Sequence, residues 1–252
     1  MTDEPRAWRV VLESIERDLL DGRLRPGDRL PGERTLSADL GVGRSSVREA
    51  LRVLEVLGLI RTATGSGPSA GAIIVALPGG GMSALMRLQV AATGFAVADI
   101  VGTRLVLETA VAADLAESAP KRSLEASVGL LDVMESRTLS ADEFLALDAQ
   151  FHLSLAEASG NQVIAATMAG LRSSIESYVR AGASTLPSWE ATSARLMLEH
   201  RDIVRAIESG DAAVARATVH SHIENYYSET NLPAHRVVGL PETVPDATPR
   251  GT

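Results

Sequence analysis

Residues 33–57 hold a short amphipathic segment, a glycine turn and a longer amphipathic segment, and this succession constrains the fold more than any other feature of the sequence. Leu36 and Leu40 share one face of the first segment, and residues 41–43, Gly-Val-Gly, interrupt the helical pattern. Apolar positions at helical spacing resume over 45–57. A short helix, a tight turn and a longer helix are the elements of a helix-turn-helix.

The flanking segments extend this unit in both directions. Residues 4–21 carry apolar side chains at helical spacing and end at an Asp-Gly pair, so they predict a preceding helix. Residues 59–62 and 72–75 read as two short strands around a loop rich in Gly, Ser and Pro. We therefore expect residues 1–76 to form a winged helix-turn-helix, with the hairpin as the wing.

The rest of the chain predicts a second domain that is entirely helical. At 252 residues and 45% apolar content, the chain can supply a core to each of two domains. Residues 77–82 contain Pro-Gly-Gly-Gly and are expected to be a linker, and residues 83–230 show successive helical segments that predict a bundle. Residues 231–252 are rich in proline and are expected to be a poorly ordered tail. The fold class is thus mainly α.

Composition and charge narrow the choice of partners. The net charge of −8 arises from residues 77–252, because residues 1–76 hold 11 arginines and 11 acidic residues. This asymmetry permits DNA binding by the N-terminal part. Cysteine is absent, which excludes disulfides and thiolate ligands. With no signal-peptide pattern and no long apolar run, we expect a cytoplasmic protein without a membrane partner.

The run from Leu24 to Ile60 contains Leu30-Pro-Gly-Glu-Arg-Thr-Leu36 and then Leu40-Gly-Val-Gly-Arg-Ser-Ser-Val-Arg-Glu-Ala-Leu51. With these motifs it resembles the GntR family of bacterial regulators. The resemblance implies a winged helix-turn-helix whose third helix enters the major groove of an operator, as a homodimer on a pseudo-palindromic site. It also implies transcription regulation, for which we expect repression, rather than catalysis.

Five residues of the helix-turn-helix are candidates for contact with DNA. Arg44 and Arg48 are four positions apart and share a face of the third helix opposite its apolar face. An arginine there can bind guanine bidentately, while Ser45 and Ser46 in the first turn suit phosphates. Arg34 on the second helix can reach the backbone or a base.

Two points about this DNA-binding surface stay open. The three arginines of the third helix could instead be a solvated face, with Arg52 included, that pairs with Glu49 and Glu55. Gly65 in the long wing loop would allow close approach to the minor groove, or the loop could simply be mobile.

In residues 83–230, Asp148 and His152 share a helix face, and His200 and His222 follow on later helical segments. In this pair and this spacing, residues 83–230 resemble the FCD effector-binding domain of the FadR branch of this family. The resemblance implies that these four side chains bind a divalent metal, for which we prefer zinc over nickel or manganese. The alternative is an ordinary polar core. His220 lies about 200° around the helix from His222, so only one of the two can face the bundle.

Two further residues are candidates for contact with an effector. In the family an arginine at the place of Arg104 points inward, and its guanidinium would bind a small carboxylate bidentately. The alternative is a structural ion pair of Arg104 with Glu108 or Asp148. Asn225 lies three positions after His222 and could contact a ligand or a metal-bound water.

Two other functions are compatible with the same residues. The Asp/His cluster could be the metal centre of a hydrolase, although we find no further motif for a general base or for orienting a substrate. The chain could also be a purely architectural DNA-binding protein, which would have no ligand pocket.

Overall fold

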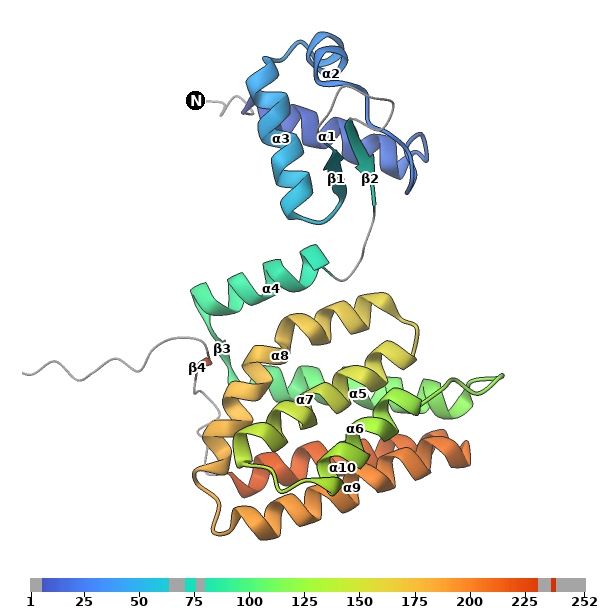
Figure 1. Ribbon diagram of the computed structural model, residues 1–252, viewed down its shortest axis with the longest axis vertical. Coiled ribbons are helices and arrows are strands. Elements are labelled where there is room, and N and C mark those ends of the chain that lie inside the picture. The colour runs from blue at the N-terminus through green and yellow to red at the C-terminus, as the bar shows by residue number, and fades with distance from the viewer. Residues whose placement is uncertain (1–5, 64–70, 76–79, 231–236, 239–252) are drawn as a thin grey trace, which may run out of the picture. The chain divides into compact units, whose positions relative to one another are not determined.

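The computed structural model describes residues 6–63, 71–75, 80–230 and 237–238, and within them the chain is mainly α-helical, as the sequence predicted (Figure 1). The chain divides into two compact units, Met1–Leu85 and Met86–Thr252. Each unit has its own cluster of buried apolar side chains.

The first unit has the order of elements that defines a winged helix-turn-helix. Its elements are α1 (Ala7–Leu20), α2 (Glu33–Leu40), α3 (Arg44–Val56), β1 (Ile60–Ala63) and β2 (Gly71–Ile74). Gly41 closes α2 at φ 65°, a left-handed conformation that glycine adopts without strain and that allows the sharp turn into α3. β1 and β2 pair antiparallel, with Ile60 opposite Ile74. Both isoleucines are buried together with apolar residues of all three helices.

The expected linker at residues 77–82 is not a linker throughout, because α4 (Gly80–Thr93) begins inside it. Gly81 lies against the end of α3, where a Cβ atom would stand 1.6 Å from the carbonyl oxygen of Leu57. The division between units falls between Leu85 and Met86. Gly81 therefore serves close backbone contact, which the glycine-rich composition alone did not distinguish from flexibility. Residues 76–79 lie outside the described residues.

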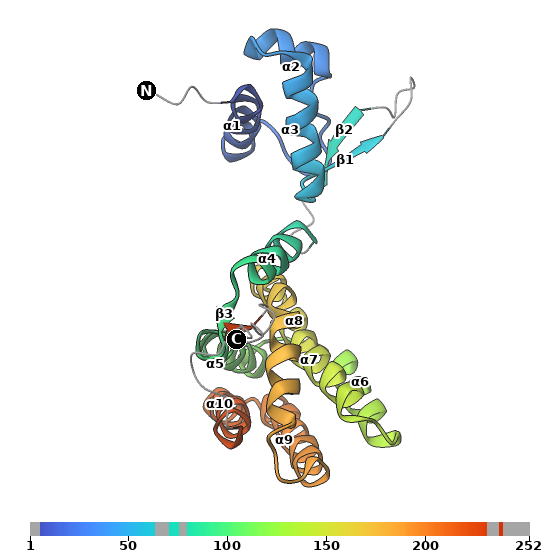
Figure 2. The same cartoon turned by 90° about the vertical axis from the view of Figure 1, so that its left-hand side faces the viewer.

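The second unit is a helical bundle, shown from two sides in Figures 1 and 2. After α4 its helices are α5 (Val97–Glu117), α6 (Glu125–Ser136), α7 (Ala141–Ala158), α8 (Gln162–Ala183), α9 (Trp189–Ser209) and α10 (Ala212–Glu229). α10 packs on α5 and α9, and α7 packs on α8 (Figure 2). These contacts bring α5, α7, α9 and α10 together around the candidate metal ligands.

Helix boundaries in the bundle follow local capping. Ser140 and Glu143 form a reciprocal capping box at the start of α7. Asn161 and Asp211 each accept two backbone N–H groups at the starts of α8 and α10. Gly210 ends α9 at φ 80°.

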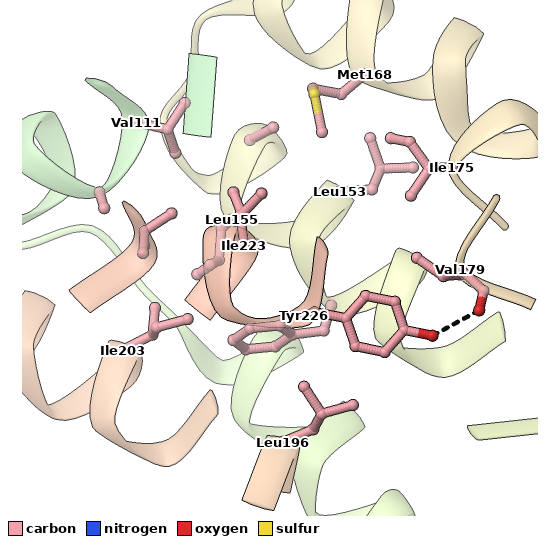
Figure 3. Packing of buried hydrophobic residues seen from close by; sticks show 14 of the residues in the cluster. Val111, Leu153, Leu155, Met168, Ile175, Val179, Leu196, Ile203, Ile223 and Tyr226 are labelled. Atoms are coloured by element: carbon pink, nitrogen blue, oxygen red, sulfur yellow. Dashed lines mark hydrogen bonds between the residues drawn. The ribbon is translucent and has the colours of Figure 1, made fainter. Parts of the chain in front are cut away.

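The bundle core consists of aliphatic side chains with a few aromatic rings (Figure 3). Tyr226 of α10 is buried in it, and its hydroxyl donates a hydrogen bond to the carbonyl oxygen of Val179 on α8 (Figure 3). This bond ties the end of α10 to α8. Among the described residues, no helix has both the length and the apolar character that crossing a membrane requires.

Part of the predicted tail forms a short strand. Within the range 231–252 that we expected to be poorly ordered, Val237–Val238 form strand β4. It pairs antiparallel with β3 (Phe95–Ala96), the short strand before α5. Backbone hydrogen bonds make this pairing, and a proline-rich composition does not reveal a two-residue strand. The remaining tail residues lie outside the described part of the chain.

Candidate metal centre and nucleic-acid interface

The predicted recognition face on α3 is exposed. Arg44, Ser45 and Arg48 are exposed, Ser46 is half-buried, and Val47 is fully buried on the opposite side of the helix. Arg34 on α2 is also exposed. Gly43 begins α3 without a side-chain cap, so the first N–H groups of the helix have no side-chain acceptor there.

The alternative of a self-paired arginine face finds no support. Glu55 accepts hydrogen bonds from the backbone N–H and the hydroxyl of Thr62 on β1. Among the described residues, Arg34, Arg44 and Arg48 form no ion pair, and neither does Arg52. Their guanidinium groups are thus available for phosphates or bases. Gly65 lies outside the described residues, so its contact with DNA stays a prediction.

In the bundle, the four candidate metal ligands come together from three helices. Asp148 and His152 lie on α7, His200 on α9 and His222 on α10, and all four are buried. Each can offer one ligand atom such that all four atoms lie within 4.8 Å of one another. Sequence reasoning from the spacing of these residues therefore found a real cluster.

The distances within the cluster suit one shared ion. Nε2 of His152 lies 3.2 Å from Nε2 of His222, and Nε2 of His200 lies 3.0 Å from Oδ1 of Asp148. Nε2 of His152 lies 4.0 Å from the same oxygen. Bonds of about 2.1 Å to a common ion separate neighbouring ligand atoms by about 3.0–3.4 Å and opposed ones by about 4 Å.

One buried ring nitrogen of the cluster lacks a partner. Nδ1 of His200 has no hydrogen-bond partner among the described residues, and its Nε2 lies 3.0 Å from Oδ1 of Asp148. An unsatisfied buried polar atom is costly, and a metal bond would satisfy it. Three imidazoles and one carboxylate are the ligand types that zinc, nickel and manganese accept. The residues present thus fit a divalent ion.

The ionisation of the cluster favours the same conclusion. Burial lowers the pKa of His222 to about 4, against the opposing effect of the hydrogen bond that its Nδ1–H donates to Glu199, and burial also lowers the pKa of His200. Burial alone would raise the pKa of Asp148, but the hydrogen bond with His200 and the nearby imidazoles lower it below the usual range. Neutral imidazoles and an ionised carboxylate are the forms that bind a cation.

Two carboxylates outside the ligand set contact the histidines from behind. Oε2 of Glu108 on α5 lies 2.6 Å from Nδ1 of His152, and Oε2 of Glu199 lies 2.8 Å from Nδ1 of His222. Such carboxylate partners fix the tautomer that leaves Nε2 free for a metal. Sequence reasoning did not assign these roles. Glu108 was noticed only as a partner for Arg104, and nothing local indicates that Glu199 faces a ring on another helix.

Arg104 is buried and forms an ion pair with Glu108, which was the structural alternative to contact with an effector. Its Nε lies 2.6 Å from Oε1 of Glu108, and its Nη1 donates to the hydroxyl of Tyr178 on α8. Burial alone would lower its pKa, but the charge of Glu108 raises it, so Arg104 stays a cation. Burial would likewise raise the pKa of Glu108, yet Arg104 and His152 hold it at about 2.

A narrow cavity adjoins Arg104 and the ligand cluster. Its free space is about 10 Å³, which is about what one water molecule needs, and its polar lining comes from Arg104, Asp148, His222 and Tyr226. A small molecule in this cavity would lie between the guanidinium and two of the four candidate ligands.

The structure corrects the orientation expected for Asn225. Its side chain is exposed on α10 and does not line the cavity. Three residues advance the helix by about 300°, whereas four advance it by about 400°, so Tyr226 repeats the direction of His222 more closely. Tyr226 is buried and lines the cavity instead. His220 is half-exposed beside Glu224 and away from the cluster, as expected of the histidine that does not face the bundle.

The cluster predicts that the metal-free protein loses stability in mild acid. Because the pKa of His222 is about 4 in the folded state and 6.5 in the unfolded chain, the unfolded chain takes up a proton first as the pH falls through 6.5. The free energy of unfolding should fall by about 2 kcal/mol between pH 7 and pH 5 from this residue, and His200 adds in the same direction. Urea unfolding with a chelator present measures this change. Equal stability at both pH values would contradict the neutral, buried state of these rings.

Comparison with known proteins gives matches in both units. Residues 9–68 match the family model described as bacterial regulatory proteins, gntR family, and residues 99–225 match the FCD domain model. The HTH-type transcriptional regulator LutR of Bacillus subtilis is 30% identical over 209 residues, covering 81% of this chain and 92% of the relative. The Glc operon transcriptional activator of Escherichia coli K12 is 30% identical over 231 residues, covering 88% and 89%. A solved structure, Streptococcus agalactiae GntR, aligns with a TM-score of 0.56 at 23% identity, over 88% of this chain and all of that one, which supports the fold.

Proposed function

Because the chain belongs to the GntR family of bacterial regulatory proteins and carries an FCD domain, we propose that it regulates transcription as a homodimer that senses a small carboxylate through a metal-containing pocket. The family and its relatives support a ligand-responsive transcriptional regulator. The observation that carries the finer proposal is the buried cluster of Asp148, His152, His200 and His222 beside the Arg104 cavity.

The charges around the cavity favour an anionic effector. Without metal, Arg104 is opposed by the carboxylates of Glu108 and Asp148, so these three groups carry a net charge of −1. A bound divalent ion changes that sum to +1 in a buried site. A buried net positive charge is stabilised by an anion, and a carboxylate can contact both an ion and a guanidinium.

The dimensions of the cavity restrict the effector to a small molecule. The free space of about 10 Å³ holds about one water molecule, so a bound effector requires the lining to move apart, and the remaining lining is aliphatic. We therefore expect a carboxylate of few carbon atoms. Arg104 would recognise its carboxylate, and the adjoining metal would be held by the four cluster residues and would supply a second positive contact.

The ion pair of Arg104 with Glu108 determines which substitution can test the role of Arg104. Removing the guanidinium would leave the buried Glu108 without a cation, which is strongly destabilising. Arg104→Lys keeps the charge but loses the planar, bidentate geometry. We expect this variant to bind metal and to lose most of the rise in melting temperature that small carboxylates produce in the metal-loaded wild type. A thermal-shift screen of organic and sugar acids supplies the measurement.

A matched control separates this effect from general packing. Arg172 pairs with Glu176 at the same four-residue spacing, with Nε 2.7 Å from the carboxylate, and does not line the cavity. Arg172→Lys should retain the full response. A full response in Arg104→Lys as well would remove Arg104 from the effector site.

For the DNA-binding unit, we propose that two copies bind a pseudo-palindromic operator. One helix-turn-helix reads few base pairs, so useful specificity needs a dimer. Arg44 and Arg48 on the exposed face of α3 would read bases, while Ser45, Ser46 and Arg34 would contact phosphates or bases, and Gly65 would approach the minor groove. The relatives carry both names, repressor and activator, so repression stays a prediction that in vitro transcription checks.

Hydrolysis at the same cluster is the second candidate, and the described residues offer it no free carboxylate beside the four candidate ligands as a general base. The carboxylates that contact the histidines from outside the ligand set, Glu108 and Glu199, are each engaged by an arginine and a histidine. Neither is free to take a proton from water, which metal-assisted hydrolysis requires. The relatives are regulators rather than enzymes, which also favours sensing. A purely architectural role would predict that no carboxylate or metal ion shifts the melting temperature.

A further inference from the structure

Glu108 contacts both halves of the candidate sensing site at once. It is 5% exposed, on α5, one helical turn after Arg104. Its Oε1 lies 2.6 Å from Nε of Arg104, and its Oε2 lies 2.6 Å from Nδ1 of His152 and 3.5 Å from Nη2 of Arg104. One carboxylate therefore holds the cation that lines the cavity and the ring of a candidate metal ligand.

Glu108 also borders a second small cavity. This cavity lies beside Glu108 and His152, and its remaining lining is apolar. That lining consists of Val111, Leu155, Ala156, Met168 and Val219. This lining offers no polar group to compensate a change of charge at Arg104 or His152, so Glu108, which contacts both, responds to such a change from this side. Tyr178 also contacts Arg104, and Asp148 lies 4.0 Å from His152.

Glu199 offers a natural comparison. It contacts Nδ1 of His222 at 2.8 Å and also pairs with an arginine, Arg195. Arg195, however, does not line the cavity, and it extends to Glu229 at 2.6 Å on a more exposed part of the helices. Glu199 thus shares with Glu108 the contact to a ligand histidine and lacks the contact to the cavity.

We propose that Glu108 is a positioning residue that couples anion binding at Arg104 to metal binding at His152. This inference rests on the proposed function. It adds Glu108 to the site and states that anion binding at Arg104 strengthens metal binding. Without an effector, Glu108 acts as an internal carboxylate that occupies the fork of Arg104. When an external carboxylate takes part of that fork, Glu108 interacts more strongly with Nδ1–H of His152, whose Nε2 then becomes a better donor to the ion. Binding at the two places is therefore cooperative, and the coupling is reciprocal.

Glu108→Gln should change the two affinities in opposite directions. The neutral amide no longer accepts as strongly from His152, so zinc affinity should fall about 10–100-fold. The amide also no longer neutralises Arg104, so in metal-free protein acetate should bind about fivefold more tightly or better. Glu199→Gln should lower zinc affinity in the same way and leave acetate affinity unchanged. A purely structural role of Glu108 would not produce a gain in anion binding.

Two titrations of the full-length protein make the test. Zinc affinity is measured by competition with a chromophoric chelator, and acetate affinity by calorimetry of chelator-treated protein at constant ionic strength, with chloride as the reference anion. If Glu108→Gln lowers zinc affinity but binds acetate no better than Glu199→Gln does, the coupling is overturned. If the wild type binds no zinc, the proposed metal site fails, and that outcome is distinct from failure of the coupling.

A second variant keeps the test decisive if Glu108→Gln does not fold. Arg104→Met combined with Glu108→Gln replaces both charges by neutral side chains of similar size, so no buried charge is left alone. This double variant should lose zinc affinity about as much as Glu199→Gln does, and it should not bind acetate. Zinc affinity equal to that of the wild type would show that Glu108 does not position His152, and would overturn the proposal.

Discussion

Alanine at His200 is expected to abolish the stabilisation of the protein by divalent metal. The ring is fully buried, its Nε2 lies 3.0 Å from Oδ1 of Asp148, and its Nδ1 has no hydrogen-bond partner among the described residues. Loss of one of four ligands should lower zinc affinity by more than the ~100-fold that loss of an outer carboxylate can cause. In the wild type, zinc at about 1,000 times its Kd should add about 4 kcal/mol to the free energy of unfolding. His200→Ala should not respond to zinc or to a chelator.

His220→Ala is the matched control for this experiment. Its side chain is 49% exposed and lies 3.4 Å from Glu224, one turn further along α10. The variant should keep the full response of the melting temperature to zinc and to chelator. Loss of the response in both variants would mean that any histidine on the protein contributes, and retention in both would remove His200 from the ligand set.

Replacing Arg44 or Arg48 by alanine is expected to lower operator affinity by about 1–3 kcal/mol, which is roughly 5- to 150-fold. Both side chains are exposed on α3 without an ion pair among the described residues, so the loss arises from contacts with DNA and not from unfolding. The operator is first selected from a random-sequence pool with the wild type. Binding is then measured at one fixed salt concentration, with unfolding curves to verify stability.

Arg23→Ala provides the control within the same unit. This arginine is engaged by Asp18 and Asp21, each at 2.6 Å, and its side chain is 56% exposed. It should bind the selected operator like the wild type, because its charge is already neutralised. Operator affinity unchanged in both Arg44→Ala and Arg48→Ala would exclude this face of α3 as the reading surface.

The parts of the fold that local patterns determine could be predicted from sequence. α2 begins and ends where the apolar spacing and Gly41 indicated, and α7 begins at the box made by Ser140 and Glu143. These signals are local, since a cap or a turn depends on a few neighbouring residues. The cluster of Asp148 with the three histidines was found because their spacing in the sequence carried the resemblance to a known domain.

What the sequence did not predict depends on tertiary contacts. The contacts of Glu108 with His152 and of Glu199 with His222 join different helices, so no spacing along one helix indicates them. The role of Gly81 was also hidden, because a glycine that allows close backbone contact and a glycine in a flexible linker look alike in sequence. For Asn225, an offset of three residues was taken as the same face, and the packing of α10 selected the position one residue later.

Both the proposed pocket and the coupling through Glu108 require a bound metal ion, so the metal content of the purified protein is the decisive measurement for them. The protein is to be purified without chelators and without a metal-affinity tag, and its metals are to be quantified by elemental analysis. We expect about one transition-metal ion per chain. The ion should be absent from His200→Ala, and zinc should restore the melting temperature of chelator-treated wild type. The metal-containing pocket is excluded if the protein contains no transition metal and its melting temperature responds to neither zinc nor nickel. Asp148, His152, His200 and His222 would then be a polar core.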